Sequence, residues 1–253
     1  MHKIFAKPLF LGKHIVYLPE CQSTNEIASK MAATSELLEG SVIITDKQTD
    51  GRGQRGNTWV TEAGKNLTFS LFLKPSFLKI SEQFNMTMII SLAVREVFEK
   101  FSHSSQVQIK WPNDVYIADR KCAGILIENS LKGNKLEEMV VGIGMNINQG
   151  NFHVSQATSL FGETGAEFEL RDVLEETLIA IEKYYLQLKN SGLHAIRSNY
   201  LSKLMWKDEW HIFEAAGKAF NGKILGVDQI GRLIVEKDKN QYAFDIKEIS
   251  FLK

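Results

Sequence analysis

The chain has 253 residues, of which 44% are hydrophobic and 24% are charged, and this composition excludes a disordered chain. Lys and Arg together number 30, as do Asp and Glu, so the formal net charge of +0 argues against electrostatic binding of the whole protein to nucleic acid. The sequence contains no apolar run of about 18 residues and no secretory signal pattern at its N-terminus. We therefore expect a cytoplasmic protein that has neither a membrane nor DNA as a partner.

The cysteines and histidines give no sign of a disulfide framework or a zinc site. Cys21 and Cys122 fit no CxxC pattern, and the six histidines are scattered along the chain. We expect both cysteines to be reduced thiols.

The first half of the chain is predicted to alternate short strands with helices. A strand over 14–18 precedes a helix that begins at Ser23-Thr24-Asn25-Glu26 and runs to about Leu38. Ser23 or Thr24 is the expected N-cap, Glu26 stands near the capping-box position, and Gly40 is expected to end the helix. Alternation and helical spacing of apolar residues predict the next elements: strands 41–46, 66–73 and 107–111, helix 81–101, and two long β segments, 114–130 and 136–148, joined near Lys132-Gly133-Asn134.

The pattern of apolar and turn-forming residues changes after about Trp206. Helices are predicted over 169–190 and 192–206, whereas short apolar runs separated by Gly or Asn/Asp pairs follow, a pattern typical of a small antiparallel β-barrel. We therefore expect an α+β domain with a mixed or antiparallel sheet over residues 1–206 and a small barrel domain over 207–253.

The segment Gly51-Arg52-Gly53-Gln54-Arg55-Gly56 is the sharpest chemical feature. Its glycines allow the backbone to approach a ligand closely and expose N–H groups, and its two arginines can hold an anion. It matches neither a Walker A motif nor a dinucleotide fingerprint. Taken alone, the segment is equally compatible with an anion site and with a solvated loop.

Three further segments carry weaker signals. Lys110-Trp111-Pro112-Asn113-Asp114 combines a cation, a turn, an amide and a carboxylate, which suit a nucleotide and its metal but also a plain turn. In Arg120-Lys121-Cys122-Ala123-Gly124 the last two residues are small, which suggests that a ligand reached by Lys121 lies against the strand. The alternating glycines of 142–148 (GIGMNIN) leave one strand face bare, where either a purine or a packed side chain fits.

In chain order, these segments resemble the motifs of the biotin–protein ligase family. They are STN at 23–25, QTDGRGQRGNTW at 48–59, KWPND at 110–114, RKCAGIL at 120–126 and GIGMNIN at 142–148, and the tail at 213–236 is similar to the family's small C-terminal domain. The resemblance covers the chain from about His14 to its end. It implies a class II synthetase-like catalytic domain, followed by an SH3-like β-barrel.

The resemblance also implies an activity and the residues that carry it. The family uses ATP and Mg²⁺ to activate biotin as biotinyl-5'-AMP, and then transfers biotin to a lysine of a biotin carboxyl carrier domain. Lys121 and Arg52 are the implied catalytic residues, and Asp114 is the implied metal ligand. The implied biotin-binding residues are Ser23, Thr24, Asn25, Gln48, Arg52, Gly53, Gln54, Lys121 and Gly124. The implied ATP-binding residues are Arg52, Arg55, Trp59, Lys110, Asn113, Asp114 and Asn146.

The chain departs from the family pattern in two respects. Gln54 and Asn57 stand where the best-known loop, GRGRxGRxW, has arginines, so phosphate contacts from these positions are not implied. Only about a dozen residues precede the first predicted strand, so we expect the form that lacks an N-terminal DNA-binding domain.

Two rival functions stay open at this point. A lipoate–protein ligase uses the same adenylation chemistry on a related fold, but the GRGQRGNTW loop and the C-terminal barrel favour biotin. A non-catalytic protein that binds peptide or RNA through its barrel is the alternative of another class. Competition between biotin and lipoate separates the first pair, and pyrophosphate release separates an enzyme from a binding protein.

Overall fold

A mixed β-sheet forms the centre of the first domain. The computed structural model describes residues 5, 7–132 and 135–252, without the side chains of 55, 131, 132 and 135. Within this part, seven strands form a sheet in the order β1-β2-β3-β7-β6-β5-β4, in which only β1 and β2 run parallel. The strands are β1 (Ile15–Cys21), β2 (Val42–Gln48), β3 (Leu67–Leu73), β4 (Val107–Lys110), β5 (Asp114–Ile117), β6 (Arg120–Lys132) and β7 (Lys135–Met145).

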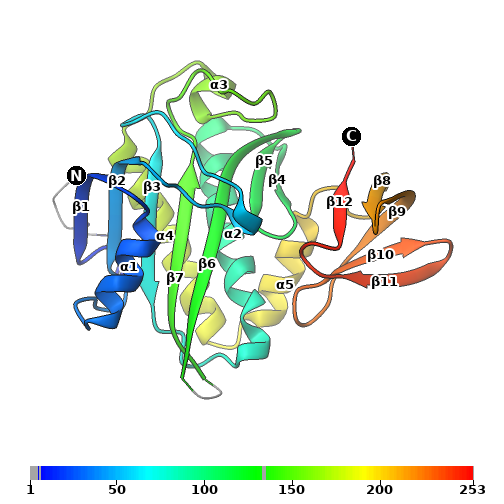
Figure 1. Cartoon of the computed structure of the whole chain (residues 1–253), viewed down its shortest axis with the longest axis horizontal. Coiled ribbons are helices and arrows are strands. Elements are labelled where there is room, and N and C mark those ends of the chain that lie inside the picture. Colours follow the sequence, from blue (N-terminus) through cyan, green and yellow to red (C-terminus); the bar gives the residue numbers. More distant parts are fainter. Residues whose placement is uncertain (1–4, 6, 133–134, 253) are drawn as a thin grey trace.

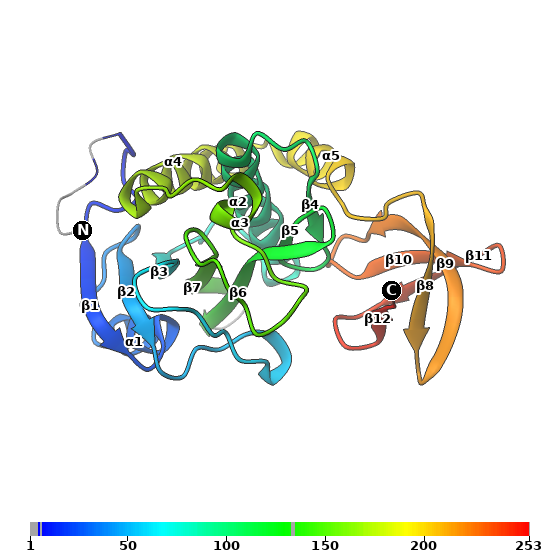
Figure 2. The same cartoon turned by 90° about the horizontal axis from the view of Figure 1, so that it is seen from above.

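The helices are unequally divided between the two faces of this sheet (Figures 1 and 2). The long helices α2 (Phe84–Ser102) and α4 (Leu170–Lys189) cover one face together with α5 (Leu193–Ser202), and their apolar residues form the main core with the strands. The opposite face carries the short helix α1 (Thr24–Ala33) and the segment that follows β2. Because long helices do not cover it, this second face can hold a ligand.

The C-terminal residues form a separate antiparallel sheet beside the β4 edge (Figure 2). Its order is β11-β10-β9-β8-β12, and its strands are β8 (Trp210–Ala215), β9 (Lys218–Val227), β10 (Leu233–Lys237), β11 (Asn240–Phe244) and β12 (Ile249–Phe251). The predicted fold class is thus confirmed: an α+β domain with a mixed sheet is followed by a small, SH3-like β unit. The domain boundary between residues 206 and 207 stays a prediction.

The C-terminal sheet is fixed to the first domain by specific contacts. The indole N–H of Trp111 donates to the backbone oxygen of Gly231 at 2.9 Å, and Arg197 donates to the backbone oxygen of Val227. Gly231 has a φ of +96°, and a Cβ there would lie 2.3 Å from the ring of Phe84. The sheet therefore lies close against the KWPND turn and α2.

Several predicted boundaries in the first half were wrong. The first helix ends at Ala33 rather than at Leu38, because Ser35 has a left-handed φ of +59°. Ser23 is the N-cap residue, as expected, but its side chain makes no capping hydrogen bond, and Glu26 pairs with Lys30 at 2.6 Å instead of closing a capping box. Gly40 lies just before β2, where its φ of +87° fits it against the backbone of Phe10.

Other differences fall in the second half. The predicted segment 114–130 is two strands, because the chain turns at Ala118, whose φ is +52°. Helix α5 ends at Ser202, short of residue 206, and α3 (Leu160–Thr164) and β12 were not predicted. The predicted junction at Gly133-Asn134 lies outside the described residues. Among the residues that are described, no helix combines the length and apolarity needed to cross a membrane.

Candidate active site

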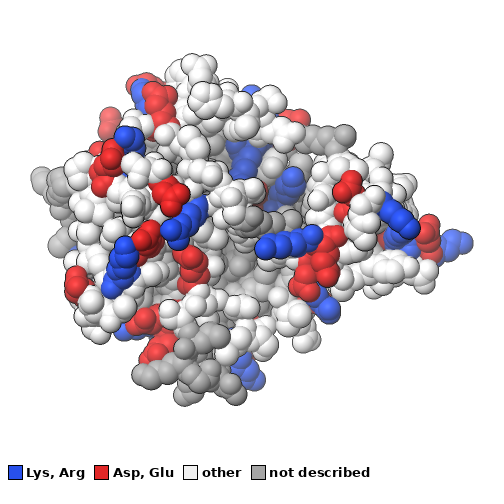
Figure 3. Space-filling view, in the orientation of Figure 1, with Lys and Arg blue, Asp and Glu red and all other residues white. Residues whose placement is uncertain are grey.

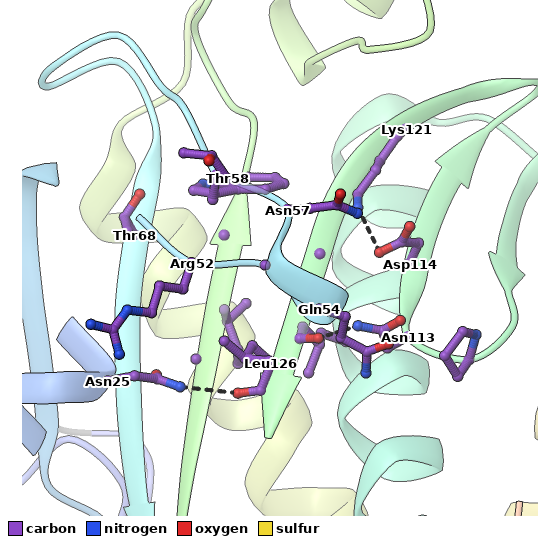
Figure 4. Close-up of a pocket in the computed structure, with 18 of the residues that line it drawn as sticks. Asn25, Arg52, Gln54, Asn57, Thr58, Thr68, Asn113, Asp114, Lys121 and Leu126 are labelled. Atoms are coloured by element: carbon purple, nitrogen blue, oxygen red, sulfur yellow. Dashed lines mark hydrogen bonds and ion pairs between the residues drawn. The ribbon is translucent and has the colours of Figure 1, made fainter. Parts of the chain in front are cut away.

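The face of the sheet that carries α1 holds a cavity of about 370 Å³, a size typical of small-molecule sites, which span about 300–1,000 Å³. Segments far apart in the sequence meet in it, including all five motif segments (Figure 4). The predicted site residues that line it are Ser23, Thr24, Asn25, Gln48, Arg52, Gly53, Gln54, Trp59, Lys110, Asn113, Asp114, Lys121 and Gly124. Their assembly supports the sequence-based choice of residues, although the role of each stays a prediction.

Two predicted site residues are not seen to line the cavity. Asn146 is buried, and its side-chain amide donates to the backbone oxygen of Thr158 at 3.0 Å. It holds the loop after β7 against the end of the sheet. The side chain of Arg55 lies outside the described residues, and its backbone belongs to the 3₁₀ turn η1 (Gln54–Gly56).

A network of uncharged side chains, joined at its edge by the exposed carboxylate of Glu128, forms one end of the cavity. The side-chain oxygen of Gln48 accepts from the backbone N–H of Thr24 at 2.8 Å and from its hydroxyl at 3.2 Å. The hydroxyl of Ser70 lies 2.7 Å from that of Thr24 and 2.6 Å from the side-chain oxygen of Asn25. The Asn25 amide in turn donates to Glu128 at 2.7 Å. Such a network presents oriented donors and acceptors to a neutral polar ligand.

The two glycines of β7 in the cavity accommodate two different side chains. A Cβ at Gly142 would lie 2.3 Å from the side-chain oxygen of Asn25, whereas one at Gly144 would lie 2.3 Å from the indole of Trp59. The bare strand face that the sequence predicted for a purine or a side chain is therefore occupied by side chains here. A larger residue at either position would displace its neighbour.

The other end of the cavity is charged. The Lys121 ammonium lies 2.7 Å from the carboxylate of Asp114, on the neighbouring strand (Figure 4). A Cβ at Gly124 would lie 3.3 Å from the Lys121 ammonium, so the small residue leaves room for the end of that side chain. Lys110 also lines the cavity. On the face shown in Figure 3, basic side chains lie around the centre with acidic ones among them.

The donor set around Asp114 bears on magnesium. Asp114 is the only carboxylate among the described residues that line the cavity, and no group of three His, Cys, Asp or Glu suited to a metal occurs in the described part of the chain. Mg²⁺ is commonly held by one or two carboxylates together with substrate phosphates. The residues therefore fit a magnesium ion that arrives with a nucleotide, but not a closed protein cage. Asn113 is buried and its amide donates to the backbone of Ile125, so it shapes the turn.

The Gly-rich segment 48–59 folds as a small hairpin over the cavity. Gly53 N–H donates to Asn57 O at 2.7 Å, and Trp59 N–H donates to Gly51 O at 2.8 Å. At its rim, Arg52 lies 3.3 Å from Glu26 and 3.6 Å from Asp50, so its guanidinium is held toward α1 (Figure 4).

Trp59 lies on the wall of the cavity itself. Its indole lies across Gly124 and Gly144, and the Lys121 ammonium is 5.6 Å from the ring centroid. The indole N–H is buried and has no hydrogen-bond partner among the described residues. An unsatisfied buried donor is unfavourable, so this position of the ring has an energetic cost.

Cys122 is the nearest thiol to Lys121 in sequence, yet it is not suited to nucleophilic attack. Its side chain is fully buried and donates to the backbone oxygen of Val115, and burial raises the pKa of its thiol well above the ordinary value. A thiol of this kind stays protonated and unreactive. The site therefore supports chemistry without a covalent thioester.

Residues of two kinds were not predicted from the sequence. Ser70 lies in the apolar strand β3, where a buried hydroxyl among Leu and Phe is a signal that could have been followed. Glu128, which orients Asn25, reads as an ordinary strand residue. The backbone or side chains of Ile249, Ser250 and Phe251 also line the cavity, and no sequence motif points to them.

Comparisons with known proteins agree with this geometry. The model of the Biotin/lipoate A/B protein ligase family matches residues 17–146. The chain is 29% identical to the bifunctional ligase/repressor BirA of Bacillus subtilis, over 94% of this chain and 74% of the relative. It is 30% identical to BirA of Escherichia coli, covering 90% of this chain and 70% of that protein. The biotin--[acetyl-CoA-carboxylase] ligase of Paracoccus denitrificans is 29% identical, over 92% of this chain and 99% of the relative.

The structural comparison leads to the same group of proteins. The structure of a biotin protein ligase from Aquifex aeolicus in complex with biotin and ATP superposes with a TM-score of 0.81 at 25% identity, covering 95% of this chain and 99% of that one. The resemblance found in the sequence is thus confirmed, and this chain belongs to the biotin/lipoate A/B protein ligase family.

Proposed function

We propose that this protein is an ATP-dependent biotin–protein ligase. It activates biotin as biotinyl-5'-AMP and transfers the biotinyl group to a lysine of a biotin carboxyl carrier domain. The observation that supports this proposal is the polarity of the cavity. One end offers neutral hydrogen-bonding groups around Thr24, Asn25 and Gln48. The other end is cationic, around Lys110 and Lys121. Biotin has the matching polarity, because a neutral cyclic urea and a carboxylate lie at its opposite ends.

The first step joins two anions, and the cationic end can offset their repulsion. The carboxylate oxygen of biotin attacks the α-phosphorus of ATP, a P–O bond forms, and pyrophosphate leaves. Lys121 and Lys110 are the candidates to stabilise the charge that develops on the phosphoryl oxygens, and Arg52, held toward α1 at the rim, is a third cation that lines the cavity. Asp114 is the candidate ligand for a magnesium ion that comes with ATP, and such an ion supplies further charge neutralisation when bound.

The second step needs an intermediate that is protected from water until the acceptor arrives. The adenylate is a reactive mixed anhydride, and the hairpin 48–59 lies where it can cover it. The amine of the carrier lysine attacks the acyl carbon, an amide bond forms, and AMP leaves with the bonding electron pair. The buried Cys122 takes no part.

Biotin is favoured over lipoate by the relatives. The family model covers both activities, but the curated relatives named above are biotin ligases or bifunctional ligase/repressors. The partner in the second step is accordingly a carrier domain of a biotin-dependent carboxylase. We place the protein in the cytoplasm, where ATP is available and where free thiols such as Cys21 and Cys122 stay reduced.

The test is pyrophosphate release from ATP by the purified protein with biotin, with lipoate, or with neither. Biotin-dependent release, followed by labelling of a carrier domain detected as a mass increase, is the expected result. Release with lipoate alone would change the substrate assignment. No release with either acid, despite intact folding, would favour a binding protein.

A further inference from the structure

The ammonium group of Lys110 lies between two aromatic rings that belong to different sheets. It is 5.2 Å from the ring centroid of Tyr116, on β5, and 5.1 Å from that of Phe251, on β12. Both distances are within the range of about 6 Å for a cation–π interaction. Lys110 lines the cavity from the first domain, so a residue near the end of the chain contacts a cation of the candidate site.

The ring of Phe251 is itself held in place. It packs 5.3 Å from the ring of Trp206 and 5.2 Å from that of Phe213, its partner across the β12–β8 pairing. The hydrogen bond from Trp111 to Gly231 ties the same sheet to the residue that follows Lys110. The C-terminal sheet therefore presents Phe251 to Lys110 as a fixed surface.

The ring of Tyr116, like that of Phe251, carries no charge. Burial, and then the carboxylate of Asp114, raise the pKa of the Tyr116 phenol, so it stays protonated at neutral pH. Its hydroxyl lies 3.5 Å from the Lys110 ammonium. Tyr116 and Phe251 thus offer two π faces to one ammonium group.

An aromatic pair changes what a lysine can do in a binding site. Lys has a long, flexible side chain, and its ordering on ligand binding is unfavourable in entropy. The two rings hold the ammonium near the cavity wall, and of its three N–H donors only one is directed to the Tyr116 hydroxyl, so others can bind an anion. A lysine held in this way loses less entropy when a phosphate group arrives.

We propose that Phe251 is a positioning residue through which the C-terminal sheet holds Lys110 ready for the phosphates of ATP. This inference rests on the proposed function, in which Lys110 belongs to the nucleotide end of the cavity. It gives the C-terminal sheet a defined part in binding the nucleotide. Biotin binding at the opposite end does not depend on it.

The first test distinguishes the effect of the aromatic face of Phe251 from that of its apolar volume. Phe251→Leu keeps an apolar side chain but removes the π face, and we expect the KM for ATP to rise roughly 3- to 10-fold with little change in the KM for biotin. Phe251→Tyr, which keeps the ring, should restore a KM for ATP near that of the wild type. Phe244→Leu is the matched control, since this ring of the same sheet packs on Phe220 and Tyr242 instead.

The second test asks whether the effect passes through Lys110. In a Lys110→Met background, Phe251→Leu should cause no further rise in the KM for ATP. Incorporation of mono-, di- and trifluorinated phenylalanine at position 251 weakens the ring quadrupole with almost no change of shape, so the KM for ATP should rise stepwise. This series stays informative if the Leu variant does not fold.

The outcomes keep this inference apart from the proposed function. A wild-type KM for ATP across the fluorinated series, or an equal effect of Phe251→Leu with and without Lys110, would overturn the role of Phe251. Absence of biotin-dependent pyrophosphate release by the wild type would instead overturn the proposed function. Calorimetric titration of the same variants with MgATP would still test Phe251, because that measurement needs no biotin.

Discussion

Lys121→Ala is the most direct test of the charged end of the cavity. Removal of one group that stabilises charge in a transition state typically lowers the rate by about 10²–10³-fold, or about 2.7–4 kcal/mol. In this protein the substitution also leaves Asp114 without the cation that lies 2.7 Å from it. An unpaired carboxylate beside the phosphates adds repulsion, so we expect a loss near the upper end, about 10³-fold.

The double variant Lys121→Ala, Asp114→Asn separates these two effects. It removes the cation and the uncompensated anion together, so its rate of adenylate formation should exceed that of Lys121→Ala by several-fold. Stability should change little, because the side chains of Lys121 and Asp114 are 31% and 25% exposed and such pairs contribute about 0–1 kcal/mol. Lys183→Ala is the matched control, since it breaks an ion pair with Glu96 that lies outside the cavity.

The assay is single-turnover formation of biotinyl-5'-AMP, with thermal unfolding measured on the same samples. Adenylate formation by Lys121→Ala at the wild-type rate would show that Lys121 does not stabilise the developing charge. If the single variant is slow and the double variant is slower still, Asp114 contributes through magnesium more than it repels the phosphates.

The other predictions concern the nucleotide end, the hairpin and the glycines of β7. Asp114→Asn should shift the magnesium titration of adenylate formation to higher concentration, and an unchanged midpoint would limit Asp114 to its ion pair with Lys121. Arg52→Ala should let the adenylate escape and biotinylate a bystander protein; an unlabelled bystander, with adenylate still formed, would place retention elsewhere. Gly142→Ala should raise the KM for biotin by about 10-fold or more, because its Cβ would lie 2.3 Å from the Asn25 oxygen, and a normal KM would show that Asn25 can move without loss. Binding of biotin plus ATP should move the Trp59 indole and change its fluorescence, measured against Trp59→Phe; identical signals from both proteins would mean that the indole stays in place.

Much of the candidate site could be predicted because short motifs carry local chemistry. The small residue at 124 predicted that another group lies close to the strand, and in the structure the end of the Lys121 side chain lies there. The alternating glycines at 142 and 144 likewise predicted a strand face free of side chains. They did not predict which neighbouring side chains occupy the space over that face. Asn25 and Trp59 fill it through pairings between distant segments, which no local pattern contains.

Element boundaries were less predictable for a related reason. Positive φ values at Ser35 and Ala118 end the first helix early and divide a long β segment, although neither residue type favours that conformation. Tertiary packing imposes these turns. The strand β12 was missed because three residues give too short a pattern for alternation, yet residues of this strand bring the C-terminal sheet to the cavity.

The position of β12 also bears on the rival that treats the C-terminal barrel as an independent binding module. Trp111 is only 4% exposed, and its N–H is satisfied by the backbone oxygen of Gly231. Phe213, Ile224 and Leu233 belong to the same hydrophobic cluster as the strands of the first sheet. Removal of the C-terminal sheet would expose this apolar surface to water, which is destabilising. A detachable module would require a polar boundary at this place, so the packing favours a sheet that works as part of the catalytic unit.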